Sequence, residues 1–272
     1  MNLEKKVKAD LHKLKLNKKS KILVALSGGK DSSVTAYLFK KLGYSVEGFH
    51  IYLGMGNYSK KCLEAVEKLC ENLKIKLHVY DIKKEMGNSM CYLRTAIQEK
   101  NKPLGNSLKN CAICGVIKKS IMNKEARKLN ADFIATGHNL DDEAQTFLLN
   151  VLKASPQLSA NSGMISQNKK DKKFITRIKP LFYIPENEVR KFSKKNKLPV
   201  HYEPCPCAID SYRIQIRKFL NQLNDDEKLN IIKNLERIQE KLKLSQQKNI
   251  SYCENCGEPC RNKICKMCEL MR

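Results

Sequence analysis

Residues 27–33 form the first segment whose residue types are suited to chemistry. They read Ser-Gly-Gly-Lys-Asp-Ser-Ser and lie between an apolar run, Ile22 to Leu26, and a stretch with helical periodicity. A loop between a buried strand and a helix gathers unpaired backbone N–H groups and the positive helix end, which together bind phosphate. Paired glycines let the backbone approach oxyanions, Lys30 adds a point charge, and Asp31 is suited to hold magnesium or to cap the helix. The segment therefore predicts a phosphate-binding loop.

This loop differs from the common Walker pattern, G-x-x-x-x-G-K-[ST]. Val24 occupies the place of the first Walker glycine, and Asp31 follows the lysine. The sequence therefore argues against an ordinary γ-phosphate NTPase. A glycine-rich turn without a ligand is the alternative.

A second polar string follows another apolar run and reads Gly137-His138-Asn139-Leu140-Asp141-Asp142-Glu143. Adjacent acids at the start of a helix can simply cap it, and for one aspartate alone that explanation would be preferred. Two acids that face a phosphate loop suit a magnesium ion, which neutralises the charge that builds as pyrophosphate leaves. We expect this string to complete a nucleotide site.

The cysteines indicate metal or redox chemistry, because six of the twelve fall in three C-x-x-C pairs. Cys111 and Cys114 begin a predicted helix, where the helix dipole and the neighbouring Lys118 favour thiolates. Cys205 lies in a proline-punctuated segment that can return to the sheet edge, with Cys207 as an alternate ligand. Three thiolates would make an incomplete iron–sulfur site. A redox disulfide or a zinc half-site is the alternative for the pair.

The C-terminal cysteines predict a structural zinc ribbon. Two pairs are separated by eight residues, which lets four thiolates close tetrahedrally around zinc in a segment too small to have its own core. The predicted ligands are Cys253, Cys256, Cys265 and Cys268. Cys260, which lies between the pairs, is an alternate ligand.

Alternating apolar and helical segments predict an α/β fold, with a parallel sheet covered by helices on both faces. Ligands of such sheets bind beyond the carboxyl ends of the strands, where both polar strings fall. A polar stretch at residues 155–173 is expected to form a loop over the site. We expect four regions: a basic N-terminal helix at 1–20, a nucleotide-binding domain at 21–200, a helical C-terminal region at 201–248, and the ribbon at 249–272.

These strings resemble motifs of known enzymes. Residues 27–33 resemble the S-G-G-x-D-S signature of PP-loop ATP pyrophosphatases, a Rossmann-like class that releases pyrophosphate while adenylating a substrate, and residues 137–143 resemble their G-H-x-x-D-D element. The resemblance narrows to the tRNA uridine 2-thiolation enzymes and covers nearly the whole chain. Its further motifs are Cys111-x-x-Cys114-Gly115-x-x-Lys118 and Cys205-Pro206 followed by Ser211-x-Arg213-x-x-x-Arg217.

The resemblance implies roles for individual residues. Members of that family hold a [4Fe-4S] cluster by three cysteines, with one iron free to bind sulfide, which implies Cys111, Cys114 and Cys205 as ligands here. Their lysine and aspartate at the positions of Lys118 and Asp142 are implicated in activity, and we add Asp31 as a third catalytic candidate. The expected nucleotide-binding residues are Ala25, Ser27, Gly28, Gly29, Lys30, Asp31, Ser32, His50, Gly137, His138 and Asp141. For His50, a buried and hydrogen-bonded core position is equally expected.

The implied reaction adenylates a uridine C2 carbonyl with ATP and Mg²⁺, after which sulfide displaces AMP. The expected cofactors are therefore ATP, Mg²⁺, a [4Fe-4S] cluster and Zn²⁺. Three alternatives are another PP-loop ligase, a non-catalytic RNA-binding zinc protein, and a cluster-free enzyme in which Cys111 and Cys114 serve as persulfide and resolving thiol. Family members commonly carry another zinc module before the first strand, for which residues 1–20 offer no cysteine, so the resemblance does not imply how tRNA is bound here.

The net charge of +24 supports a polyanionic partner, although a Lys-rich genome composition would also produce it. We expect tRNA as that partner, sulfide or a ubiquitin-like carrier as the sulfur source, and a homodimer by resemblance. Residues 1–19 lack the apolar core of a signal peptide, and no apolar run is long enough to span a bilayer. We therefore expect a cytoplasmic protein without membrane contact.

Overall fold

The central sheet is parallel, as the alternating apolar runs predict. The computed structural model describes residues 2–102, 108–165, 171, 173–208, 213–244 and 251–272. Five strands lie in the order β3-β2-β1-β4-β5, and every neighbouring pair is parallel. The strand bounds are β1 Lys21–Leu26, β2 Ser45–Tyr52, β3 Leu77–Asp81, β4 Phe133–Ala135 and β5 Thr176–Ile178.

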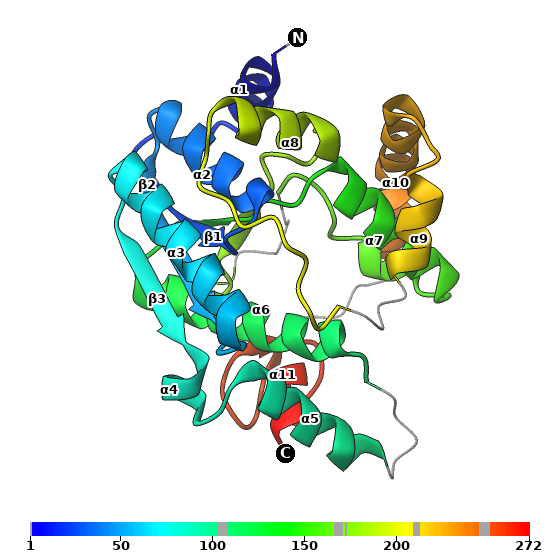
Figure 1. Cartoon of the computed structure of the whole chain (residues 1–272). Helices are drawn as coiled ribbons and strands as arrows, with labels where there is room; N and C mark the ends of the chain where they lie inside the picture. Colours follow the sequence, from blue (N-terminus) through cyan, green and yellow to red (C-terminus); the bar gives the residue numbers. More distant parts are fainter. Residues whose placement is uncertain (1, 103–107, 166–170, 172, 209–212, 245–250) are drawn as a thin grey trace.

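Helices cover both faces of the sheet (Figure 1). Successive residues of a strand point to opposite faces, so Ile22 and Val24 join one core cluster while Leu23 joins the other. The first cluster includes residues of α1 Leu3–Lys13, α2 Lys30–Lys41, α3 Gly56–Leu73 and α8 Glu186–Lys195. The second includes residues of α4 Ile82–Met86, α5 Met90–Asn101 and α6 Asn110–Lys128.

The two polar strings lie at the same edge of the sheet. Strand β1 ends at Leu26 and is followed by α2, and β4 ends at Ala135 and is followed by α7 Leu140–Leu152. Because β1 and β4 are parallel neighbours, their carboxyl ends place the two loops side by side.

The C-terminal helices pack on α7 and share a core with it. This core includes Leu140, Ile216 and Leu235, which belong to α7, α9 Arg213–Leu220 and α10 Asp225–Leu244 respectively. The polar stretch at 155–173 is predicted to be a loop; its described residues contain a 3₁₀ helix, η2 Pro156–Ser159, and an isolated bridge from Ile165 to Ile178, and the other described residues lack regular structure. Residues 166–170 and 172 of that stretch lie outside the described residues.

The C-terminal segment forms a small module against α6 (Figure 1). It consists of a hairpin, β6 Ser251–Tyr252 with β7 Pro259–Cys260, and a helix, α11 Lys266–Met271. Leu270 of α11 is buried in the second core cluster, and Glu258 forms an ion pair with Arg127 of α6. The module therefore depends on the main domain for its packing.

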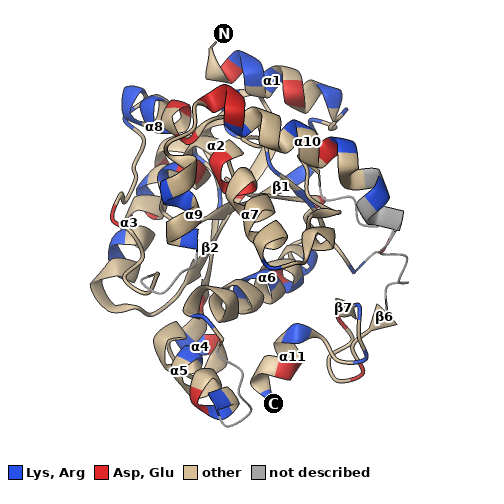
Figure 2. Ribbon diagram, turned by 90° about the vertical axis from the view of Figure 1, so that its right-hand side faces the viewer, with Lys and Arg blue, Asp and Glu red and all other residues tan. Residues whose placement is uncertain are grey.

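Basic side chains are spread over many helices. Figure 2 shows Lys and Arg on α6, α8 and α9. No helix in the described part of the chain combines the length and apolarity needed to cross a membrane.

Candidate active site

The glycine loop after β1 has the backbone geometry of a phosphate site. Gly28 has a φ of +86°, and a Cβ at this residue would lie 2.8 Å from the carbonyl oxygen of Cys62, so glycine is required there. Gly29 caps α2 without a side-chain acceptor. The Ser32 hydroxyl donates to the Gly29 carbonyl at 2.9 Å and accepts from the Ser27 N–H at 3.2 Å, which fixes the loop. The first N–H groups of α2 thus point to a ligand position.

Lys30 stands at the centre of a charge network. Its Nζ lies 2.9 Å from Asp31 Oδ2 and 2.8 Å from Glu186 Oε1, and Glu186 also accepts from Arg217 at 2.8 Å. Burial alone would lower the pKa of Lys30, but the charges of Asp31 and Glu186 outweigh it and raise the pKa. Lys30 therefore stays cationic beside the loop. We did not single out Glu186 from the sequence, because nothing in the motif pattern links it to a loop 156 residues earlier.

The second polar loop touches the first. A Cβ at Gly137 would lie 2.5 Å from the backbone carbon of Asp31, so only glycine permits this contact. Asn139 donates to Asp31 Oδ1 at 3.1 Å and forms a capping box with Asp142 at the start of α7. The two loops are therefore in direct contact at this edge of the sheet.

Asp31 and Asp142 are the acids suited to a cation. Burial raises the pKa of Asp142 to about 6, and the nearby charge of Asp31 acts in the same direction. A divalent ion between these carboxylates would relieve that repulsion. Asp141 is engaged elsewhere, since it accepts from Lys228 Nζ at 2.8 Å and from the Glu186 N–H at 2.7 Å.

The two predicted histidines differ in their surroundings. His50 is 3% exposed, and its Nδ1 lies 2.8 Å from the Leu26 carbonyl oxygen. His50 is thus the buried, hydrogen-bonded core residue that was one of its two predicted roles. Burial lowers the pKa of His50. His138 stands within the second loop, where its Nδ1 lies 3.0 Å from the Thr136 hydroxyl.

The predicted cluster ligands come from two segments, the start of α6 and the loop that carries Cys205. Cys111 and Cys114 lie in the first turn and a half of α6, where three-residue spacing puts them on one face. The segment that carries Cys205 is tied to this helix, because Asn110 Nδ2 donates to the Cys207 carbonyl at 3.3 Å. Burial raises the pKa of Cys205, the charges of Cys207 and Cys114 act in the same direction, and Lys118 opposes them. Cysteine sulfurs are the usual ligands of iron–sulfur clusters, so Cys111, Cys114 and Cys205 stay predicted ligands. Among the described residues, the group close enough to share one metal ion is formed by the C-terminal cysteines instead.

Cys207 has a different partner from Cys205. Its Sγ accepts from Arg94 Nη2 at 3.2 Å, and Arg94 is 8% exposed. This contact occupies the sulfur of the alternate ligand. Cys62 and Cys70 are buried in α3.

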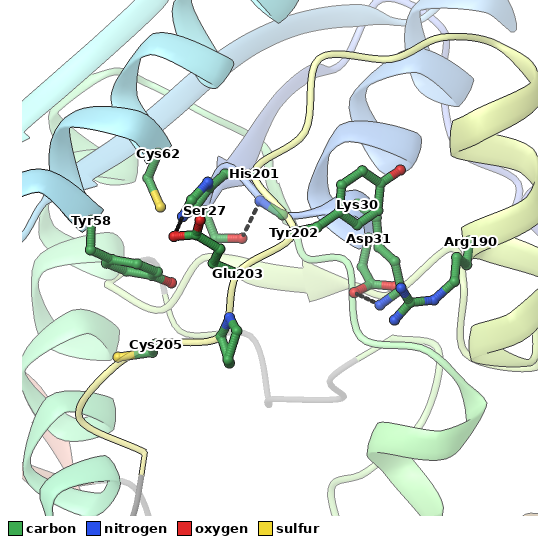
Figure 3. Close-up of a pocket in the computed structure, with 12 residues that line it drawn as sticks. Ser27, Lys30, Asp31, Tyr58, Cys62, Arg190, His201, Tyr202, Glu203 and Cys205 are labelled. Atoms are coloured by element: carbon green, nitrogen blue, oxygen red, sulfur yellow. Dashed lines mark hydrogen bonds and ion pairs between the residues drawn. The ribbon is translucent and has the colours of Figure 1, made fainter.

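A cavity of about 220 Å³ lies between the phosphate loop and two cysteines, Cys62 and Cys205 (Figure 3). Ser27, Lys30 and Asp31 line one side, and Tyr58, Cys62 and Cys205 line another. In Figure 3 the Cys62 and Cys205 sulfurs lie on either side of the Tyr58 ring. The sequence did not identify Tyr58, His201 or Arg190 as site residues, because single residues of these types carry no motif.

The four C-terminal cysteines form the predicted tetrad. Their sulfur atoms all lie within 4.8 Å of one another, a separation that suits one tetrahedral ion. The Cys265 N–H donates to Cys253 Sγ at 3.2 Å, and the Cys268 N–H donates to Cys265 Sγ at 3.4 Å. Cys260 lies outside the tetrad and donates to the Asn262 carbonyl at 2.8 Å.

Comparison with known proteins agrees with this geometry. The model of the PP-loop domain family matches residues 2–224. A tRNA-5-methyluridine(54) 2-sulfurtransferase of Pyrococcus horikoshii is 36% identical over 274 residues, which cover 98% of this chain and 83% of the relative. The chain belongs to the PP-loop tRNA 2-sulfurtransferase family.

Further relatives of this family include one of known structure. The U34-tRNA thiolase NcsA from Methanococcus maripaludis, solved with its [4Fe-4S] cluster, matches with a TM-score of 0.77 and 29% identity, over 98% of this chain and 85% of that chain. The tRNA 2-thiolation protein NcsA of Haloferax volcanii is 29% identical, over 92% of this chain and 81% of the relative. The predicted fold class is confirmed by these matches.

Proposed function

We propose that this protein is an ATP-dependent sulfurtransferase that forms 2-thiouridine in tRNA. Its relatives are named as tRNA 2-sulfurtransferases and tRNA thiolases, which supports the proposal. One observation carries the proposal: a single cavity is lined by the phosphate loop on one side and by Cys205 on another. A uridine in that cavity would meet both the activating phosphate and the incoming sulfur. An amide-forming PP-loop ligase needs the first side and has no use for the second.

The residues around the loop would activate the uridine. The N–H groups at the start of α2 and Lys30 would bind the diphosphate of ATP that becomes the leaving group. Asp31 and Asp142 would hold the magnesium ion that neutralises its charge. The uridine O2 would then attack the α-phosphate. The bond to pyrophosphate would break in the same step.

Cys111, Cys114 and Cys205 would hold the cluster. When bound, it would supply an iron site that presents sulfide to the activated C2 carbon. The charge of Lys118 acts to lower the pKa of the Cys205 thiol, so the two side chains are near each other. The exposed ammonium of Lys118 would neutralise charge as AMP leaves. The oxygen at C2 is thereby replaced by sulfur without net oxidation or reduction.

Further parts of the proposal concern zinc and partners. Cys253, Cys256, Cys265 and Cys268 would bind a structural Zn²⁺. Partial burial lowers the pKa of Lys119, and the like charges of Arg177 and Arg213 lower it further, so these cations form a cluster suited to RNA phosphate. We extend the proposal to a cytoplasmic homodimer that takes sulfur as free sulfide or from a ubiquitin-like carrier.

Pyrophosphate release tests the proposal. Protein purified without oxygen should contain iron and acid-labile sulfide, and it should release pyrophosphate from ATP only when tRNA is added. Release with a small carboxylic acid in place of tRNA would favour the ligase. Iron-free protein that still thiolates tRNA would favour the persulfide alternative.

A further inference from the structure

His201 lines the cavity between the phosphate loop and Cys205, and its Nε2 is buried beneath the cavity wall. Its side chain is 10% exposed, and its Nε2 has no hydrogen-bond partner among the described residues. Glu203 Oε2 lies 3.5 Å from Nε2, within ion-pair distance but without hydrogen-bond geometry. A buried polar atom without a hydrogen bond is costly in a folded protein, so it points to a ligand. The Glu203 side chain is 64% exposed and would turn away when a ligand reaches Nε2.

The position of His201 is fixed by its surroundings. Its backbone N–H donates to the Gly28 carbonyl at 2.8 Å, which ties the residue to the phosphate loop. Its ring packs edge-on against Tyr58, with 5.3 Å between the ring centroids. In Figure 3 the ring stands next to Ser27, on the side of the cavity that faces Tyr58. The imidazole therefore lies between the two parts of the site.

The proposed reaction requires a proton acceptor in this place. When the uracil O2 bonds to the α-phosphate, the pyrophosphate bond breaks and C2 forms a double bond to N3, so the N3 proton must leave. N3 is the ring neighbour of C2, the carbon that must face the sulfur. A group between the phosphate loop and Cys205 therefore faces the C2–N3 edge of the base.

We propose that His201 Nε2 accepts the N3 proton of the target uridine. This inference rests on the proposed function. A neutral imidazole accepts through one ring nitrogen, and histidine is the side chain suited to proton transfer near neutral pH. When hydrosulfide replaces the AMP oxygen at C2, the imidazolium returns its proton to N3. The proton of the hydrosulfide passes to water, and no electrons are gained or lost.

The test uses His201→Gln, which keeps the backbone contact to Gly28 and a polar side chain but cannot take the proton. The single-turnover rate of tRNA-dependent pyrophosphate release should fall about a hundredfold at saturating ATP and tRNA. Iron content, thermal unfolding and ATP affinity should match the wild type. His12→Gln, at an exposed residue of α1, is the matched control and should release pyrophosphate at the wild-type rate.

A substrate with a more acidic N3 proton distinguishes proton transfer by His201 from a purely structural role of this residue. A tRNA with 5-fluorouridine at the modified position has a more acidic N3 proton, so the gap between wild type and His201→Gln should narrow about tenfold. His201→Asn should show the same narrowing. An equal gap with both substrates would overturn the inference, and so would weaker ATP binding that accounts for the whole loss.

The two proposals fail in different ways. If the wild type releases no pyrophosphate with tRNA, the proposed function is wrong and this inference falls with it. If the wild type does so and His201→Gln is unimpaired, the inference alone is wrong.

Discussion

At the scale of single residues, the contact between the two loops depends on Gly137. A Cβ at this residue would lie 2.5–2.7 Å from backbone atoms of Asp31 and Ser32, which cannot move away as a flexible side chain could. We expect Gly137→Ala to lower the free energy of unfolding by about 1–3 kcal/mol and to weaken ATP binding at least about tenfold.

Gly115 gives a matched control for this substitution. It lies inside α6 with no atom near its Cβ position, so Gly115→Ala should raise stability by about 0.5–1 kcal/mol through helix propensity. Urea unfolding and ATP titration measure both variants. Equal effects of the two substitutions would contradict the proposed close contact.

Glu186, which is paired with Lys30 of the phosphate loop, should make the free energy of unfolding depend on pH in the acid range. Burial alone would raise the pKa of Glu186, but hydrogen bonds from Lys30 and Arg217 lower it to about 2. Because the folded pKa lies below the ordinary value of 4.5, this stabilisation is complete above about pH 4.5. It is lost as the pH falls through about 2. Glu186→Gln should lower stability at pH 7 by on the order of 1–3 kcal/mol.

The pH dependence of this variant provides the check. Between pH 4.5 and 2, the wild type should lose more of its free energy of unfolding than Glu186→Gln does, because the variant has no carboxylate to protonate there. Denaturant unfolding at several pH values measures the difference. Parallel curves for the two proteins would show that Glu186 does not carry the effect.

At the scale of elements, the start of α6 should hold the cluster together with Cys205. Cys205→Ser should lose most of the bound iron and its broad visible absorption after anaerobic purification, because two ligands do not hold the cluster. Cys207→Ser should keep both, since Cys207 is engaged by Arg94. Iron analysis of the two variants provides the measurement. Loss of iron from Cys207→Ser alone would assign the third ligand to Cys207.

Among the elements, those whose periodicity is local were predicted best. The apolar run Ile22 to Leu26 lies in β1, and the helix predicted to begin with Cys111 is α6. Pairing of the two polar loops also followed from parallel-sheet geometry. The roles of Glu186 and His201 did not follow, because both reach the site through contacts with residues more than 150 positions earlier in the chain. Such contacts leave no spacing in the sequence.

At the scale of the whole molecule, the cysteine tetrad lies in a module that completes the second core cluster. Leu270 is 5% exposed and belongs to the core cluster that includes residues of α6, while Glu258 accepts a hydrogen bond from Asn123 of α6. Cys253→Ser should lose about one zinc per chain and lower the melting temperature, because the module is too small to fold without its metal. Cys260→Ser, outside the tetrad, should retain zinc. Equal zinc content in both variants would contradict the proposed ligands.

In the proposed reaction, a single site activates the uridine and delivers sulfur to it. The most direct measurement is mass analysis of nucleosides from tRNA incubated anaerobically with the cluster-loaded protein, Mg-ATP and sulfide. We predict a uridine whose mass has changed by replacement of one oxygen with sulfur, formed only when ATP is present. Pyrophosphate release with no thiolated nucleoside, at either of the positions named for the relatives or elsewhere in the tRNA, would contradict the account.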